Sequence, residues 1–220
     1  MVRDDAELTL RLARVLAPVT VLGPGSRIAL WVQGCGLACA SCASVDTWDS
    51  AGGAVLPVAR AADLVVEQVR ALGLNGITIS GGEPTDQGRS LTALLDQVRR
   101  ALAPRDIDVL VFTGRTFPAA RTVAPALVAT ADCVVSGPYR ADRPADGRLL
   151  ASDNQELSFR TPDVERRYRR WLAASGPSLQ VTADDRDLYL VGLPAAGDLD
   201  RFAVGLQDRG VTLGAVSWRA

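Results

Sequence analysis

The hydrophobic positions of the chain form short apolar runs that alternate with amphipathic stripes. Runs of this kind, bounded by glycine or proline, are typical of strands that are covered on both faces. The runs that predict strands are residues 19–22, 28–32, 76–80, 107–112 and 133–136. Residues 8–16 mix helical and strand periods and predict neither element.

Between these runs, apolar residues recur at helical spacing. Residues 58–72 carry such a stripe and are followed by Gly73, a common helix stop. Residues 90–103 form the clearest stripe, with Ser90 as a candidate N-cap, and residues 117–130 form a weaker one. Strands that alternate with helices indicate a parallel sheet with right-handed crossovers. We therefore predict an α/β fold, a partial and open β/α barrel with a mostly parallel sheet, over residues 1–159.

The remaining residues, 160–220, predict a small α+β extension. Thr161 and Pro162 begin a helix, because threonine is a good N-cap and proline suits the first helical position. Further along, residues 178–183 and 187–193 predict a hairpin around a turn at 184–186. A helix at 198–209 and a strand at 211–216 are expected to follow. About 60 residues is marginal for an independent domain, so we expect the extension to pack on the core.

Composition excludes several classes of chemistry. The chain has 220 residues, a net charge of −1 and 48% hydrophobic residues, which describes an ordinary globular protein and not a basic nucleic-acid binder. It contains no histidine and no lysine, so histidine triads, imidazole metal sites and Schiff-base lysines are excluded. The arginines at 166, 167, 169 and 170 are interpreted as a solvated helix face.

The chain gives no sign of a membrane or of export. No apolar run approaches the roughly 20 residues of a membrane span. Residues 1–7 are too acidic for a signal peptide. The expected location is the cytoplasm, where thiols stay reduced.

Three of the four cysteines, Cys35, Cys39 and Cys42, lie in one stretch directly after a predicted strand. An odd number of thiols at this spacing does not form a disulfide set and indicates metal ligands. Three thiolates suit an iron–sulfur cube whose fourth iron is left open to another molecule. A zinc site, which usually needs four protein ligands, and a chance group of buried cysteines are the alternatives.

A second motif, Gly81-Gly82-Glu83-Pro84, follows the predicted strand 76–80. On its own it predicts only a turn. However, the carboxyl ends of parallel strands meet at one edge of a sheet, so the motif is expected on the same face as the cysteines. Glycines would let a ligand approach the backbone, and carbonyls with a carboxylate would suit a ligand that carries an ammonium group.

Together these motifs resemble the radical S-adenosylmethionine (SAM) superfamily, and more closely the activating enzymes of anaerobic ribonucleotide reductase. The resemblance covers roughly residues 19–157. The matching segments are GPGSR at 23–27, WVQGC at 31–35, DTWD at 46–49, ISGGEP at 79–84, VFTG at 111–114, GPY at 137–139 and SDNQ at 152–155. The family usually has an acidic residue where this chain has Ser136.

The resemblance implies a [4Fe–4S] cluster on the three cysteines, with SAM bound to the open iron. It implies that the reduced cluster cleaves SAM to methionine and a 5′-deoxyadenosyl radical, which abstracts hydrogen. The implied SAM contacts are Gly81, Gly82, Glu83 and Pro84 for the methionine amino group, Ser41 near the adenine, and Thr113 and Ser136 near the ribose and sulfonium. No catalytic side chain beyond the cluster is implied.

The implied hydrogen donor is a glycine in a glycyl-radical enzyme such as anaerobic ribonucleotide reductase, with a flavodoxin- or ferredoxin-type electron donor. Neither nucleic acid nor membrane is an expected partner. One alternative is a radical SAM enzyme that modifies a peptide or a small metabolite. Another is a non-catalytic iron–sulfur electron carrier or a zinc-stabilised binding module.

Overall fold

The computed structural model describes residues 8–145, 148–183, 187–194, 197–212, 214 and 216. The predictions for residues 1–7 and for the turn at 184–186 lie outside the described residues. Within this part of the chain, no helix is long and apolar enough to cross a membrane.

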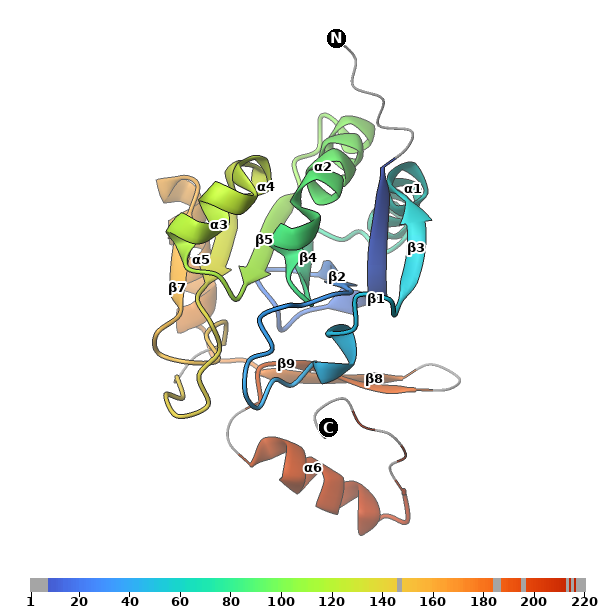
Figure 1. Ribbon diagram of the computed structural model, residues 1–220, viewed down its shortest axis with the longest axis vertical. Helices are drawn as coiled ribbons and strands as arrows, with labels where there is room; N and C mark the ends of the chain where they lie inside the picture. The colour runs from blue at the N-terminus through green and yellow to red at the C-terminus, as the bar shows by residue number, and fades with distance from the viewer. Residues whose placement is uncertain are drawn as a thin grey trace.

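A seven-stranded sheet forms the centre of the molecule (Figure 1). Its order is β3-β1-β2-β4-β5-β6-β7. The four central strands, β2, β4, β5 and β6, pair in parallel, while β1, β3 and β7 pair antiparallel at the two sides. The strands are β1 (Thr9–Val19), β2 (Arg27–Val32), β3 (Ala54–Pro57), β4 (Gly76–Gly81), β5 (Asp108–Thr113), β6 (Cys133–Ser136) and β7 (Glu156–Phe159).

The predicted α/β class and its parallel centre are confirmed, but the sheet as a whole is mixed. The run at 19–22 was expected to be a strand, and this is wrong beyond Val19, which ends β1. Val21 and Leu22 are buried all the same, in the connection from β1 to β2. The apolar run therefore reflects burial of side chains and not backbone pairing. The unassigned residues 8–16 belong mostly to β1, and β7 was not foreseen.

Helices α1 (Val58–Ala71), α2 (Gly88–Leu102), α3 (Phe117–Val123) and α4 (Pro125–Thr130) lie together on one face of the sheet (Figure 1). Their apolar stripes pack on alternate residues of the parallel strands and form the main core. The expected helix at 117–130 is divided at Ala124, because the residue before a proline avoids the helical conformation. Ser90 does not cap α2, which already begins at Gly88; its hydroxyl donates to the Thr9 carbonyl.

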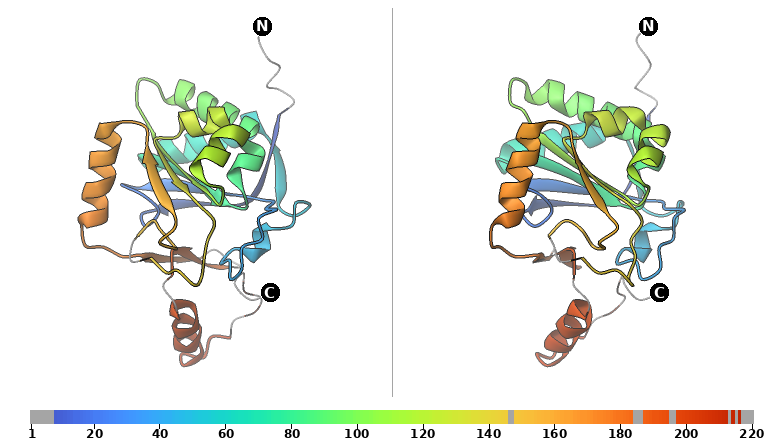
Figure 2. Two further views of the ribbon diagram at one scale, coloured as in Figure 1. Left: turned by 60° about the vertical axis from the view of Figure 1, so that its left-hand side comes forward. Right: turned by 90° about the vertical axis from the view of Figure 1, so that its left-hand side faces the viewer.

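The opposite face of the sheet is covered by the helix at residues 162–173 and by the two strands at residues 179–183 and 188–192 (Figure 2). Helix α5 (Pro162–Ala173) begins with the expected Thr161 cap. Its Tyr168 is fully buried, and the hydroxyl donates to Asp108 Oδ1 of β5 at 2.7 Å. Arg27, also fully buried, donates to the same oxygen at 2.7 Å from β2. This network ties α5 to two strands of the sheet.

A two-stranded sheet, β8 (Leu179–Ala183) with β9 (Leu188–Gly192), crosses the same face. Val191 of β9 is buried in an apolar cluster with Trp31 of β2 and the β1–β2 connection. Gln180 of β8 accepts hydrogen bonds from the backbone and hydroxyl of Thr20. The hairpin is thereby fastened to the sheet through apolar and polar contacts.

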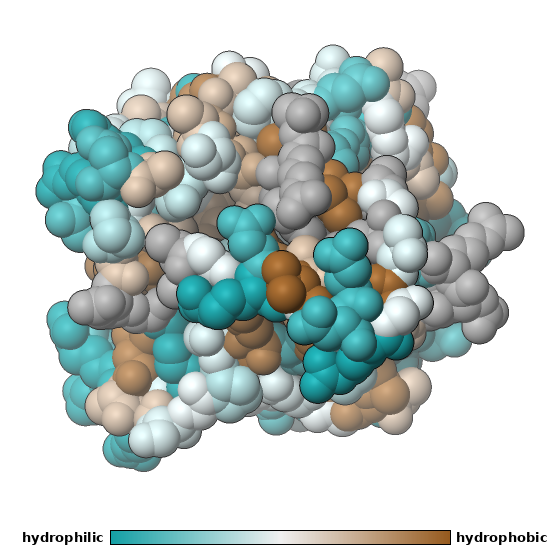
Figure 3. Space-filling model, turned by 90° about the horizontal axis from the view of Figure 1, so that it is seen from below, coloured by the Kyte–Doolittle hydropathy of each residue, from teal (hydrophilic) through white to brown (hydrophobic). Residues whose placement is uncertain are grey.

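Helix α6 (Asp198–Gln207) follows the hairpin and buries none of its described residues. This end of the molecule shows hydrophobic residues scattered among hydrophilic ones (Figure 3). Val204 on α6 is 55% exposed. The strand expected at 211–216 is absent from the residues described there, 211, 212, 214 and 216, and its other two residues lie outside the described part.

Candidate functional site

The candidate site lies where the four parallel strands end. Because parallel strands place their carboxyl ends at one edge, the loops after β2, β4, β5 and β6 meet there. The loop after β2 carries the three cysteines, and residues 81–84 comprise the last residue of β4 and the start of the loop after it. Residues at these strand ends contact one another directly, since the backbone of Glu83 donates to the Gly34 carbonyl and that of Gly137 donates to the Thr113 carbonyl.

The cysteine loop leaves β2 at Gln33 and is closed by hydrogen bonds between its two ends. The backbone of Cys35 donates to the Trp48 carbonyl at 3.1 Å, and that of Gly34 donates to the Thr47 carbonyl at 2.8 Å. The Gln33 side chain donates to the carbonyls of Asp46 and Asp49 at 3.0 and 2.8 Å. These bonds hold both limbs of the loop against the end of β2.

All three cysteines of this loop are free thiols and half-buried. Between them, Ala38 and Ser41 adopt left-handed backbone conformations, with φ of 45° and 61°, which non-glycine residues seldom adopt. Burial raises the pKa of the Cys35 thiol, with a smaller contribution from the negative charge of Glu83. Left-handed conformations at non-glycine residues raise the conformational energy of the folded chain, and such residues are common at ligand-binding sites.

The donor set suits an iron–sulfur cluster. In the part of the chain that the structure describes, no three histidine, cysteine, aspartate or glutamate side chains are grouped to hold one metal ion. A cluster does not need such convergence, because each thiolate of the cube binds a different iron. Three soft thiolates on one loop, in a chain without histidine, therefore fit a cluster as ligands.

Gly81, the last residue of β4, and Gly82, which follows it, lie against the end of β2 and the start of the cysteine loop. Gly81 has φ of 103°, in the region that favours glycine. A Cβ atom on Gly82 would meet the Gly34 carbonyl oxygen at 2.2 Å. The backbone of Glu83 donates to that same oxygen at 2.8 Å. These glycines were expected to let a ligand approach the backbone closely. In this structure they allow the close approach of the strand that leads into Cys35.

Glu83 is 1% exposed and lies between the ends of β4 and β5. Its Oε1 accepts hydrogen bonds from the backbone and hydroxyl of Thr85 and from the hydroxyl of Thr113, at 2.9, 2.7 and 2.7 Å. Its Oε2 accepts from the backbone of Gly114 at 2.9 Å. Pro84, also buried, begins the short 3-10 helix η3 (Pro84–Gln87).

Thr113 and Ser136 are neighbours in the sheet, paired in the register of β5 and β6. Both are buried, and among the described residues the Ser136 hydroxyl has no hydrogen-bond partner. Above them, Leu37 of the cysteine loop approaches Gly114, since a Cβ atom there would meet Leu37 Cδ1 at 2.6 Å. Ser41 is exposed on the cysteine loop. The structure thus brings together the loop start, residues 81–84, Thr113 and Ser136.

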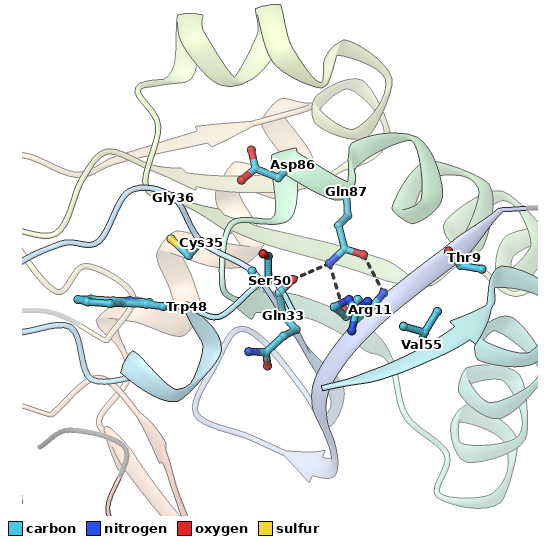
Figure 4. A pocket seen from close by; sticks show the side chains of 11 residues that line it. Thr9, Arg11, Gln33, Cys35, Gly36, Trp48, Ser50, Val55, Asp86 and Gln87 are labelled. Atoms are coloured by element: carbon cyan, nitrogen blue, oxygen red, sulfur yellow. Dashed lines mark hydrogen bonds between the residues drawn. The ribbon is translucent and has the colours of Figure 1, made fainter. Parts of the chain in front are cut away.

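A cavity of about 580 Å³ extends from Cys35 toward Thr9 and Arg11 of β1 and Val55 of β3 (Figure 4). Gln87 spans it, with Oε1 accepting from the Arg11 backbone and Nε2 donating to the carbonyls of Arg11 and Gln33. Gln33 lies in the matching segment at 31–35 but was given no role of its own, and Gln87 was not predicted. A polar residue directly after the buried strand 28–32 was the available signal for Gln33, whereas nothing local marked Gln87.

Comparison with known proteins connects this site to a family. Residues 21–158 match the family described as "4Fe-4S single cluster domain". This range includes the three cysteines, residues 81–84, Thr113 and Ser136, and it ends before α5. The family description names the iron–sulfur cluster that the cysteine spacing favoured over zinc.

Individual relatives are activating enzymes. The chain is 28% identical to the anaerobic ribonucleoside-triphosphate reductase-activating protein of Enterobacteria phage T4, over 66% of this chain and 90% of that protein. It is 29% identical to the protein of the same name from Vibrio cholerae, over 56% and 80%. It is 38% identical to the pyruvate formate-lyase-activating enzyme of Clostridium pasteurianum, over 33% of this chain and 32% of that enzyme.

These relatives confirm the resemblance to radical SAM activating enzymes and the expectation of an enzyme. The family match covers more than half of the chain. The chain therefore belongs to the 4Fe-4S single cluster domain family.

Proposed function

We propose that this protein is a radical SAM enzyme that activates a glycyl-radical partner. One observation carries the proposal: the cysteine loop, residues 81–84 and the Thr113–Ser136 pair meet at the carboxyl edge of the parallel strands. An electron carrier needs only the cysteines. The additional buried polar groups beside them support a site for a second ligand.

In this proposal Cys35, Cys39 and Cys42 hold a [4Fe–4S] cluster. When bound, the cluster supplies the electron that cleaves SAM to methionine and a 5′-deoxyadenosyl radical. The Gly81, Gly82, Glu83 and Pro84 segment receives the methionine amino group, and Ser41 lies near the adenine. Thr113 and Ser136 face the ribose and sulfonium. The unpaired hydroxyl of buried Ser136 supports a ligand contact there, since buried polar groups normally have partners.

The chain's own contribution is geometry and exclusion of water. The closed cysteine loop fixes the ligands, and Leu37 packs toward Gly114 at the end of β5. Buried surroundings strengthen electrostatic interactions and protect a reactive intermediate. Hydrogen abstraction by a radical needs no general base, so the absence of histidine and lysine is compatible with it.

The names of the relatives support a glycyl-radical enzyme as the partner, with anaerobic ribonucleotide reductase as the first candidate. A flavodoxin- or ferredoxin-type protein would supply the electron. A second candidate function is modification of a peptide or small metabolite. It is favoured by one observation: residues 159–220 lie beyond the family match, and their hairpin covers one face of the sheet.

We further propose that residues 1–159 form the radical SAM core, a partial barrel, and that residues 160–220 form an extension packed on it. The contacts of Tyr168 with Asp108 and of Val191 with Trp31 support this arrangement. The cytoplasm is the proposed location, supported by the free thiols of all four cysteines.

SAM cleavage is the direct test. Protein purified without oxygen and reconstituted with iron and sulfide is mixed with dithionite and SAM, and 5′-deoxyadenosine is measured. We expect the product in the wild type and none in Cys39→Ala. Cys133→Ala, which alters the buried fourth cysteine on β6, is the matched control and should retain cleavage. A protein that binds about four irons per chain but never cleaves SAM would favour an electron carrier.

A further inference from the structure

The carboxamide of Gln87 lies where β2 leaves β1 and continues into the cysteine loop. On the side of this loop, the pairing register of the two strands ends with Leu12 and Val32. One residue further, the Gln33 backbone donates to the Arg11 carbonyl at 3.0 Å. Gln87 Oε1 accepts from the Arg11 backbone at 2.8 Å, and Nε2 donates to the carbonyls of Arg11 and Gln33 at 2.9 and 3.0 Å. The side-chain amide thus pairs with Arg11 as the peptide group of a neighbouring strand would.

The start of helix α2 does not account for this glutamine. Gln87 is the N-cap residue of α2, but its side chain makes no capping bond to the helix, and glutamine is not among the preferred N-cap residues. The attachment of α2 to β1 has a second side-chain bond, because the Ser90 hydroxyl donates to the Thr9 carbonyl at 2.6 Å. The contacts of Gln87 therefore need another explanation.

The two residues that Gln87 binds also hold the second limb of the cysteine loop, residues 46–52. Arg11 Nη1 donates to the carbonyls of Ala51 and Gly52 at 3.0 and 2.9 Å. The Gln33 side chain, which is 5% exposed, donates to two further carbonyls of this limb at 3.0 and 2.8 Å. Any shift of the Arg11 or Gln33 backbone would therefore be passed on to the cysteine loop.

The first limb of the loop is held from the other side by the segment 81–87. Three consecutive carbonyls, those of residues 32–34, accept hydrogen bonds from this segment. The donors are the backbones of Gly82 and Glu83, at 2.8 Å each, and Gln87 Nε2 at 3.0 Å. Of these three bonds, that of Gln87 comes from a side chain, so a substitution can remove it and leave the backbone unchanged.

We propose that Gln87 is a positioning residue that holds the cysteine loop at a fixed distance from residues 81–84. It acts through the backbones of Arg11 and Gln33. This inference rests on the proposed function, in which the loop carries the cluster and residues 81–84 bind SAM. Reacting groups need to be held within roughly 0.5 Å of their productive geometry, and residues around the site supply that precision.

Hydrogen exchange of the full-length, reduced and cluster-free protein tests this role without any ligand. Gln87→Met keeps the approximate length of the side chain and removes all three of its hydrogen bonds. Mass spectrometry with fragmentation follows four backbone amides, those of Gly34 and Cys35 in the loop and those of Gly82 and Glu83 opposite it. We expect all four to exchange about tenfold faster in Gln87→Met, the effect of losing about one or two net hydrogen bonds.

Ser90→Ala is the matched control, because it removes the other side-chain bond between α2 and β1, which ends on Thr9. We expect it to leave the four amides unchanged within about twofold. If both variants accelerate these amides equally, Gln87 only fastens α2 to the sheet and the positioning role is wrong. The role is equally wrong if Gln87→Met leaves the amides unchanged. Should Gln87→Met not fold, Gln87→Glu, which keeps an acceptor for the Arg11 backbone and loses both donors, takes its place with the same expectation.

In the reconstituted protein, the positioning role predicts a defect that follows cluster assembly. Gln87→Met should bind about four irons per chain, as the wild type does. The electron paramagnetic resonance signal of its reduced cluster should respond to SAM only at about tenfold higher concentration, a usual effect of losing a residue that orients a metal site. If the response to SAM matches that of the wild type, or if iron is lost instead, Gln87 does not set this distance and the proposal is wrong.

The two proposals fail in different ways. If SAM neither changes the signal of the wild type nor is cleaved by it, the proposed function fails. The exchange experiment still decides whether Gln87 holds the two segments together. If the wild type cleaves SAM but Gln87→Met behaves as Ser90→Ala does in both experiments, the proposed function stands and the positioning role is refuted.

Discussion

Gly82 lies where the loop after β4 crosses the strand that leads into the cysteines. A Cβ atom at this position would stand 2.2 Å from the Gly34 carbonyl oxygen and 2.7 Å from its carbon. Ordinary van der Waals contact begins near 3.4 Å. Both neighbours are backbone atoms, so Gly82→Ala requires the two segments to separate by about 1 Å, which no side-chain rotation can avoid.

The loss of unfolding free energy can be worked out from the hydrogen bonds that this separation would break. The backbone of Gly82 donates to Val32 and that of Glu83 donates to Gly34, both at 2.8 Å. Losing two backbone hydrogen bonds costs about 1 kcal/mol each, and the residual strain adds about 1–3 kcal/mol. The lower entropy of the unfolded alanine chain returns about 0.5–1 kcal/mol. We therefore expect Gly82→Ala to lower the free energy of unfolding by about 3 kcal/mol.

Urea unfolding of the reduced, cluster-free protein measures this change. With a slope of about 2–3 kcal/mol per molar urea, the midpoint should fall by about 1–1.5 M. Gly36→Ala is the matched control, because Gly36 lies in the same region and a Cβ atom there meets nothing within 4 Å. If both substitutions shift the midpoint equally, or if Gly82→Ala costs under 1 kcal/mol, the packing argument is refuted.

Three further predictions concern buried polar groups. Tyr168→Phe removes the donor to Asp108 and should cost about 1–3 kcal/mol of unfolding free energy, measured by urea titration. Burial raises the pKa of the Cys133 thiol far above its ordinary value. Between about pH 8.5 and 10 the unfolded chain therefore releases a proton that the folded chain keeps, and stability falls with rising pH by up to about 1.4 kcal/mol per unit. Cys133→Ala should reduce that slope and leave the part that comes from the raised pKa of the Cys35 thiol. An unchanged slope would contradict the assignment. Gln33→Leu removes both side-chain bonds that close the cysteine loop, so it should cost about 2–3 kcal/mol and lower the iron bound after reconstitution, whereas Gln68→Leu on α1 should do neither.

Features that depend on neighbouring residues could be predicted from the sequence. The spacing of Cys35, Cys39 and Cys42 is a local property, and it indicated the iron–sulfur site before any fold was known. The stripe of α2 and the buried run of β5 are likewise local patterns, and both elements form close to their expected places. The Thr161 cap of α5 also formed as expected. In each case the residues that specify the feature lie in one short, continuous segment of the chain.

Other features arise from contacts between distant segments. The mixed pattern of residues 8–16 becomes β1 because β2 and β3 supply backbone partners on its two sides. The apolar run at 19–22 is buried without being a strand, since burial needs only apolar neighbours whereas a strand needs a paired backbone. Gln87 contacts Arg11 across 76 positions of sequence, and no local pattern could have marked it.

The sequence alone determined which chemical groups the site can use. It places three cysteines on one loop and a glycine-rich turn after a buried strand, and it contains no histidine or lysine that could act as a base or nucleophile. The tertiary structure decided what these residues do for one another. It showed that Gly82 is a glycine because Gly34 is its neighbour, and that the Glu83 carboxylate is occupied by β5. The physical reason is that ligand types are carried by single residues, whereas close approach and hydrogen bonding between segments depend on which distant parts of the chain meet.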